Sequence, residues 1–195
     1  SLQFKRLMPL LESRFRPPLF LRNGHLQTIL GALLPRRFRN DVLAERLELP
    51  DGDFLDLDWV KAGHRRLAVI SHGLEGSSKN RDIRGLSAAL NKAGWDTLAW
   101  NFRGCSGELN RCLRFYHSGE TGDLSAVLSH AAGSYSSLAL VGFSLGGNMI
   151  LKYLGEGNVH PFVHAAVAIS APVDLASSAR ALDRRPGNQI YLRRF

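Results

Sequence analysis

The residues best suited to carry out chemistry form the pattern Gly-x-Ser-x-Gly, with Ser144 between Gly142 and Gly146. A short apolar run precedes the pattern and a helical pattern follows it, which is the context of a nucleophile elbow. Such a turn holds its serine in a strained conformation, and the two glycines remove clashes with the neighbouring backbone. We therefore expect Ser144 to be a catalytic nucleophile; a glycine-rich turn without chemistry is the alternative.

A serine nucleophile also needs N–H donors for the oxyanion that its attack creates. The backbone N–H of Leu145 is one candidate, since it opens the helix whose N-terminus carries partial positive charge. The second donor is expected from the loop after an earlier strand, where His72-Gly73-Leu74 stands. We assign the donor to the Leu74 N–H. Gly73 allows a close approach, and His72 is expected to brace the loop rather than to act as the base. A plain turn is the alternative for this loop.

The elements that must position these residues alternate between strands and helices after an initial hairpin. A turn at Asp51-Gly52 joins the hairpin strands, and the second strand alternates apolar residues with Asp56 and Asp58, which we expect on the solvent face rather than in a metal site. The expected strands cover residues 45–49, 54–60, 67–70, 95–100, 138–143 and 165–169, and the expected helices cover residues 83–93, 120–132 and 148–154.

This order predicts an α/β fold with a mostly parallel sheet, helices on both faces and an antiparallel N-terminal hairpin. Loops at the carboxyl ends of parallel strands share one edge of the sheet. We therefore expect the loops of His72-Gly73, Arg103-Gly104 and Ser144 to converge there, with Arg103 tying the loops together.

Composition favours a globular domain, and the charge is uneven along the chain. The 195 residues carry a formal net charge of +8, with basic segments at residues 1–40 and 180–195. Solvated ends or contact with an anionic membrane surface would explain them. There is no nucleic-acid motif, no apolar run near the ~20 residues of a membrane span and no signal-peptide pattern, so we expect a cytoplasmic protein that does not bind nucleic acid. Cys105 and Cys112 are expected to be free thiols.

We divide the chain into a basic, proline-punctuated lead-in at residues 1–42 and a core at residues 43–195. In the lead-in, Asn23 is expected to cap a short helix containing His25, a residue that we interpret as structural.

Five motifs in this order resemble those of the YheT-like α/β-hydrolases, a family that also includes embryogenesis-associated and lipid-hydrolysing ABHD-type proteins. The motifs are Asn23-Gly24-His25-Leu26-Gln27-Thr28, His72 to Ser78, Asn101 to Glu108, Tyr116 to Asp123 and Gly142 to Asn148. The resemblance implies a serine hydrolase of carboxylic esters, with lipid or acylglycerol esters as the substrate class; short-chain acyl esters are the alternative substrates. No metal or other cofactor is expected, since the sequence contains no metal-ligand cluster and no dinucleotide-binding fingerprint. The resemblance assigns the nucleophile to Ser144 and the oxyanion loop to His72-Gly73-Leu74.

The triad is incomplete in this sequence. In this fold the acid and the histidine follow the serine, and only His160, His164, Asp174 and Asp183 are available there. The two histidines are expected at the amino end of the last strand, far from Ser144. Asp174 belongs to a stretch, residues 171–174, that resembles the entry to a lid segment. We therefore identify neither acid nor base.

Family members continue for more than a hundred residues further, so we expect a truncated or split hydrolase that lacks its C-terminal strands. Its strand at 165–169 would be an exposed edge able to self-associate. A non-catalytic fragment that binds an acyl ligand or a partner is the alternative function, and acyl transfer is a third.

Overall fold

The computed structural model describes residues 11–24, 26–27, 30 and 41–183, without the side chain of residue 182. The chain divides into two compact units, residues 1–37 and residues 38–195. In the first unit, a 3₁₀ helix η1 covers Leu19–Leu21. The backbone is helical at Gly24, Leu26 and Gln27, and the Leu26 N–H donates to Asn23 Oδ1 at 3.4 Å, which is the expected cap. His25 and most of the two basic segments lie outside the described residues.

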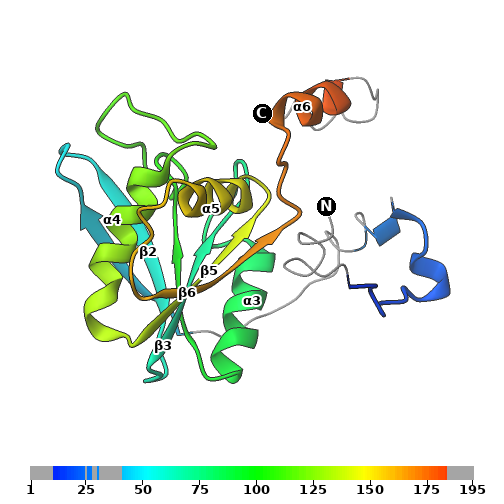
Figure 1. Cartoon of the computed structure of the whole chain (residues 1–195), viewed down its shortest axis with the longest axis horizontal. Helices are drawn as coiled ribbons and strands as arrows, with labels where there is room; N and C mark the ends of the chain where they lie inside the picture. The colour runs from blue at the N-terminus through cyan, green and yellow to red at the C-terminus, as the bar shows by residue number, and fades with distance from the viewer. Residues whose placement is uncertain (1–10, 25, 28–29, 31–40, 184–195) are drawn as a thin grey trace. The chain divides into compact units, whose positions relative to one another are not determined.

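The second unit contains a six-stranded sheet in the order β1-β2-β4-β3-β5-β6 (Figure 1). Its strands are β1 (Leu43–Glu48), β2 (Phe54–Val60), β3 (Arg66–Ser71), β4 (Asp96–Trp100), β5 (Ser137–Phe143) and β6 (Val163–Ile169). β1 and β2 form the antiparallel hairpin, and β2 runs antiparallel to β4. The pairs β4–β3, β3–β5 and β5–β6 are parallel. The predicted α/β class and the predicted hairpin are confirmed.

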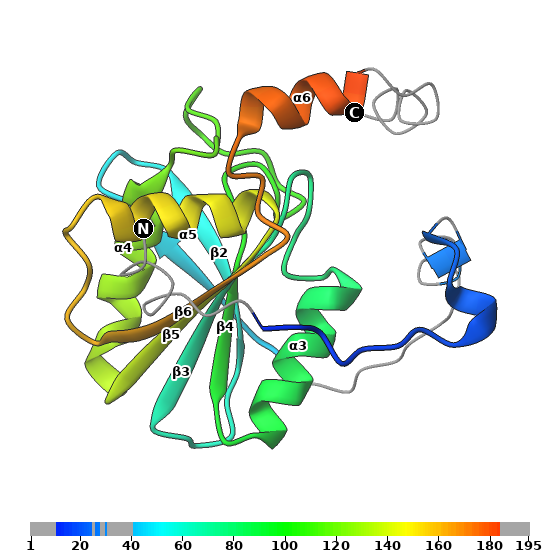
Figure 2. The same ribbon diagram turned by 45° about the vertical axis from the view of Figure 1, so that its right-hand side comes forward.

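The helices of this unit are α3 (Arg81–Lys92), α4 (Thr121–Ala131), α5 (Leu145–Gly155) and α6 (Leu175–Asp183), with a short 3₁₀ helix η2 (Ala132–Ser134) after α4. α3 packs Ile83 against Ile70 and Ala99 of the sheet. α4 and α5 contribute side chains such as Leu128 and Ile150 to the larger cluster on the opposite face (Figure 2). Helices therefore cover both faces of the sheet, as predicted.

Two turns that the sequence predicts have the backbone conformation that their glycines permit. Gly52 in the β1–β2 turn has φ +84°, and Gly94 after α3 has φ +83°, both in the left-handed region that favours glycine. The alternation along β2 is also observed, because Leu55 and Leu57 are buried while Asp56 and Asp58 are half-buried.

β6 is the last strand of the described sheet on the side of Ser144, and it pairs only with β5 among the described strands. Most of its residues are exposed, and Val167 retains 51% of its accessible surface. The edge strand expected at this position is therefore present. None of the helices in the described ranges combines the length and the apolar character that crossing a membrane requires.

Candidate active site

Ser144 lies in a sharp turn between β5 and α5, where it is exposed. Its backbone has φ +50° and ψ −114°, a conformation that residues other than glycine rarely adopt. Two hydrogen bonds hold it there: the Ser144 N–H donates to Ile169 O at 2.9 Å, and the Asn148 N–H donates to Ser144 O at 3.0 Å. The turn therefore holds a strained serine at the N-terminus of a helix, as the sequence pattern predicts.

The two glycines of the pattern lie where no side chain fits. A Cβ atom at Gly142 would lie 2.5 Å from the carbonyl carbon of Gly146. A Cβ atom at Gly146 would lie 2.6 Å from the carbonyl oxygen of Ser71 and still closer to that of His72. The end of β3 and the start of α5 are thus in backbone contact, which places the loop after β3 beside Ser144.

Gly73 brings that loop into close approach with Ser144. A Cβ atom added at Gly73 would lie 3.3 Å from Ser144 Cβ and 4.0 Å from Ser144 Oγ. Leu74 follows immediately and is exposed. The structure therefore brings together the segments to which the sequence assigns the nucleophile and the oxyanion donors.

His72 is buried and both of its ring nitrogens have partners. Nε2 accepts a hydrogen bond from the Phe102 N–H at 3.1 Å, so Nδ1 carries the proton and donates to Gly73 O at 2.7 Å. Burial lowers the pKa of His72 to about 4. A neutral imidazole with both nitrogens occupied is unsuited to take a proton from Ser144, and it does brace the loop as expected.

Tyr116 and Asn101 hold the rest of the loop after β3. The Glu75 N–H donates to Tyr116 Oη at 3.0 Å, and the Ser78 N–H donates to Asn101 Oδ1 at 2.9 Å. Asn101 in turn donates to Asp56 O at 2.9 Å. The role of Tyr116 is not recognisable from its sequence motif, because its contact with Glu75 joins loops that are distant in the chain.

Backbone strain gathers at this end of the sheet. Among the described residues other than glycine, only Glu75, Ser144 and Ser170 have positive φ, at 53°, 50° and 51°. They follow β3, β5 and β6 respectively. Residues in such conformations persist only where the surrounding structure enforces them, and they cluster at functional sites.

Arg103 ties loops together, as the sequence analysis expects. Its guanidinium is buried, with two hydrogen bonds of 2.8 Å to the Asp123 carboxylate and a third of 2.8 Å to Asp53 Oδ2. Asp51 adds an ion pair at 2.9 Å. The loop after β4 is thereby fastened to the β1–β2 turn and to α4, and Arg103 is not available to a substrate.

The candidate acids and bases after Ser144 form no hydrogen bond with it among the described residues. His160 and His164 lie near the start of β6, where Val163 pairs with Leu138, whereas Ser144 follows the other end of β5. Asp174 caps α6, since its Oδ1 accepts from the Ser177 N–H at 2.9 Å. Among the described residues, none accepts a hydrogen bond from the Ser144 hydroxyl, and the acid and base remain unidentified.

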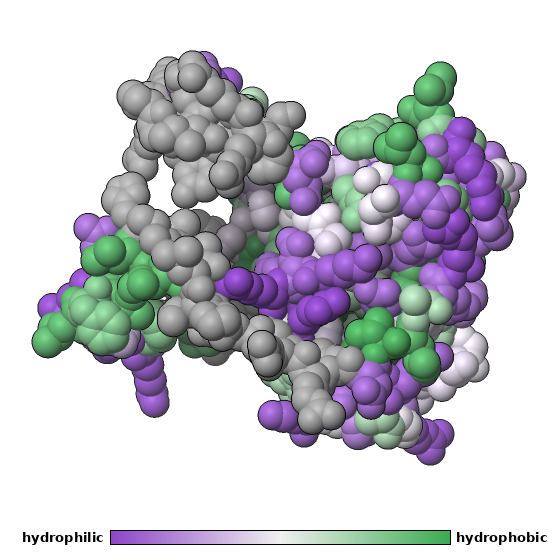
Figure 3. Space-filling view, turned by 180° about the vertical axis from the view of Figure 1, so that it is seen from behind, coloured by the Kyte–Doolittle hydropathy of each residue, from purple (hydrophilic) through white to green (hydrophobic). Residues whose placement is uncertain are grey.

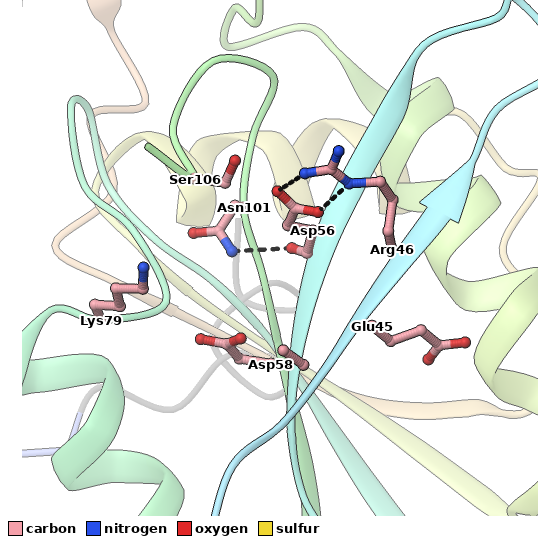
Figure 4. Close-up of a pocket in the computed structure, with 8 residues that line it drawn as sticks. Glu45, Arg46, Asp56, Asp58, Lys79, Asn101 and Ser106 are labelled. Carbon is pink, nitrogen blue, oxygen red and sulfur yellow. Dashed lines mark hydrogen bonds and ion pairs between the residues drawn. The ribbon is translucent and has the colours of Figure 1, made fainter. Parts of the chain in front are cut away.

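A polar pocket of about 350 Å³ lies beside β1 and β2, apart from Ser144 (Figure 4). Arg46 lines this pocket and forms ion pairs with Asp56 at 2.7 Å and with Glu108 at 2.7 Å. Asp58 in the same pocket accepts from Ser78 Oγ at 2.7 Å. Within the part of the chain that the structure describes, no three His, Cys, Asp or Glu side chains are placed to hold a metal ion.

An exposed serine with positive φ, set between a strand and a helix and packed against a His-Gly loop, has the strand–turn–helix geometry of the nucleophile elbows found in α/β-hydrolases. The model of the family described as the alpha/beta hydrolase fold matches residues 69–192. The chain therefore belongs to the α/β-hydrolase family.

Two relatives and one solved structure illustrate this membership. The chain is 44% identical over 180 residues to YheT of Escherichia coli, which is named as an esterase, and the match covers 89% of this chain and 53% of YheT. It is 28% identical over 174 residues to the phospholipase ABHD3 of Homo sapiens, covering 81% and 42%. The esterase Pf2001 of Pyrococcus furiosus superimposes with a TM-score of 0.61 at 21% identity, covering 76% of this chain and 62% of that one, which shows the fold alone. The chain spans about half the length of the curated relatives that it matches.

Proposed function

We propose that this chain supplies the nucleophile and the oxyanion hole of a serine hydrolase that acts on carboxylic esters. The observation that carries the proposal is the conformation of Ser144, which is exposed on a strained turn. The glycines on either side of it, Gly142 and Gly146, lie so close to other backbone that no larger residue fits at their positions. Relatives named as esterase and phospholipase support the same reaction class.

In the proposed reaction, Ser144 Oγ attacks the ester carbonyl carbon and its proton passes to a general base. The backbone N–H groups of Leu145 and Leu74 hold the resulting oxyanion. Collapse of the intermediate breaks the carbon–oxygen bond to the alcohol, which leaves with the proton, and an acyl-Ser144 ester remains. Water then cleaves that ester to the carboxylic acid and regenerates the hydroxyl. The described residues supply no base within reach of Ser144, so the proposal requires one from elsewhere in the active protein.

For the substrate, we propose a lipid or acylglycerol ester. The name of the human relative as a phospholipase supports this class. The exposed side chain of Leu74, which follows Gly73 in the loop that lies against Ser144, adds apolar surface to that loop. A comparison of hydrolysis across p-nitrophenyl esters of increasing acyl length tests the class: rates that fall from short to long chains contradict a lipid substrate.

The alternative is a non-catalytic module that binds an acyl ligand. This alternative is favoured by the observation that no described residue accepts a hydrogen bond from the Ser144 hydroxyl. Labelling with a fluorophosphonate probe separates the two functions. The hydrolase, tested in the form of the protein that contains its general base, requires labelling that disappears in Ser144→Ala and persists in Ser170→Ala, a matched control because Ser170 also follows a strand with positive φ. A folded protein that contains the base and does not label contradicts an active nucleophile at Ser144 and supports the binding module.

Self-association through β6 is a separate proposal, which its position at the sheet edge and its exposed residues support. Size-exclusion chromatography tests it with Val167→Lys, which places a charge on the edge. A wild-type chain that elutes as a monomer contradicts the proposal.

A further inference from the structure

The loop at residues 105–119, which we call the rim loop, directs apolar side chains outward. Leu109 is 86% exposed, Leu113 is fully exposed and Phe115 is 59% exposed. Single exposed apolar residues are ordinary on protein surfaces, but three within one short loop are not. The rim loop follows β4 and contacts the loop after β3 through Tyr116 and Glu75, so it lies at the same end of the sheet as Ser144.

The Asn110 side chain and the Arg111 backbone of the rim loop are directed toward the protein interior. Asn110 donates to Asp53 Oδ1 and to Phe54 O, each at 2.8 Å, and its side-chain oxygen accepts from the Gly104 N–H. The Arg111 N–H donates to Asp53 Oδ1 at 3.1 Å. Asp53 itself is fully buried beside Arg103. The chain between Leu109 and Leu113 is therefore anchored on the β1–β2 turn through its polar groups.

This arrangement reverses the usual pattern of a surface loop, in which apolar residues turn inward. The inward hydrogen bonds fix the backbone, so the exposure of the two leucines is built into the loop. Leu74, 60% exposed, and Val173, 79% exposed, follow β3 and β6 and add apolar surface at the same end of the sheet. Figure 3 shows hydrophobic side chains protruding at its upper right, the side on which the green loop of Figure 1 lies.

We propose that the rim loop inserts Leu109 and Leu113 into the surface of an anionic lipid membrane. Separate protruding side chains suit a fluid acyl layer, which closes around them, better than a protein partner, whose interface needs continuous complementary area. The net charge of +8 favours anionic headgroups, and the segments at residues 1–40 and 180–195 carry the excess of positive charge. Insertion does not depend on a reaction at Ser144, but it would turn the end of the sheet that carries the nucleophile toward the lipid.

Co-sedimentation of the full chain with vesicles of phosphatidylcholine and phosphatidylglycerol tests the insertion. Burial of a leucine side chain corresponds to a change of about tenfold or more in partitioning. The double variant Leu109→Ser/Leu113→Ser is therefore expected to bind about 100-fold more weakly. Leu43→Ser is the matched control, because Leu43 is 58% exposed on β1 near the opposite end of the sheet, and it should bind as the wild type does. Unchanged melting temperatures establish that the variants fold.

A fluorescence experiment gives a positive signal for the same contact. Leu113→Trp is expected to shift its emission to shorter wavelength when vesicles are added and to be quenched by brominated phospholipid, whereas Leu43→Trp is not. Wild-type binding by the double variant overturns the proposal and leaves only electrostatic contact through the basic segments. An emission shift that follows protein concentration without lipid also overturns it, since a second copy would then cover the loop. Ser144→Ala should bind vesicles normally, so failure of the hydrolase proposal is distinguishable.

Discussion

The ring of His72 stands between two backbones, accepting from the Phe102 N–H at 3.1 Å and donating to the carbonyl of its own neighbour, Gly73. The rings of His72 and Phe102 also lie close together, with their centroids 4.0 Å apart. Through this contact the loop after β4 sets the position of the loop that lies against Ser144. His72 is thus a positioning residue, and its protonation state matters because the Phe102 N–H needs an unprotonated Nε2.

Stability should therefore fall on acidification. The pKa of His72 is about 4 in the folded chain, because of burial, and about 6.5 when unfolded, so the unfolded state takes up a proton first as the pH falls. The stabilisation is complete above about pH 6.5 and is lost toward pH 4. Urea unfolding should show a contribution of about 2 kcal/mol lost between pH 7 and pH 4.5. His72→Gln should lack this component, whereas His117→Gln, at an exposed position, should retain it. Equal pH dependence in His72→Gln and the wild type would show that His72 does not carry the effect.

The glycines of the elbow should be intolerant of the smallest side chain. Gly142→Ala places a Cβ atom 2.5 Å from backbone atoms of Gly146, so the turn must shift or the strand must move away. We expect a loss of about 3 kcal/mol or more in the free energy of unfolding, together with loss of probe labelling. Gly155→Ala is the control, because nothing lies within 4 Å of its Cβ position at the end of α5. A fully stable Gly142→Ala variant would contradict the described turn.

Replacing the strained serine should separate stability from function. Both Ser144→Ala and Ser144→Gly remove the hydroxyl, but only glycine accepts φ +50° without steric cost. We expect Ser144→Gly to be more stable than Ser144→Ala by about 1 kcal/mol in thermal or urea unfolding. The reverse order would show that the turn stores no strain at this residue.

The buried ion cluster should be more sensitive than surface pairs. Asp123→Asn weakens the contact with Arg103 and leaves a buried guanidinium short of one negative charge, which should cost about 3 kcal/mol. Glu156→Gln disrupts the exposed pair with Lys152 and should cost less than about 1 kcal/mol. Urea unfolding of both variants measures the difference, and equal losses would contradict a buried role for the Arg103 cluster.

The features that local sequence determines are the ones that sequence analysis predicted well. The elbow at Ser144, the turn at Gly52 and the helix end at Gly94 each depend on a few adjacent residues. The hydrogen bond of Tyr116 to Glu75 and the burial of Asp53 beside Arg103 were not predictable in the same way, because they join residues that only the folded sheet brings together. The outward leucines of the rim loop were missed for a related reason: Leu109 and Leu113 carry no periodicity that separates them from core residues.

The place of β3 in the sheet determines when, during folding, the loop at Gly73 and Ser144 come together. β3 lies between β4 and β5, and both of these partners follow it in the chain. Ser71 pairs with Trp100 on one side and with Gly142 on the other, so the second pairing closes a much longer loop. Such non-local pairing is slow, since chain entropy is lost before the contact forms. During synthesis, the loop at Gly73 is complete long before β5 arrives to present Ser144 beside it. The contact between the loop at Gly73 and Ser144 is therefore made late in folding, once the sheet has closed around β3.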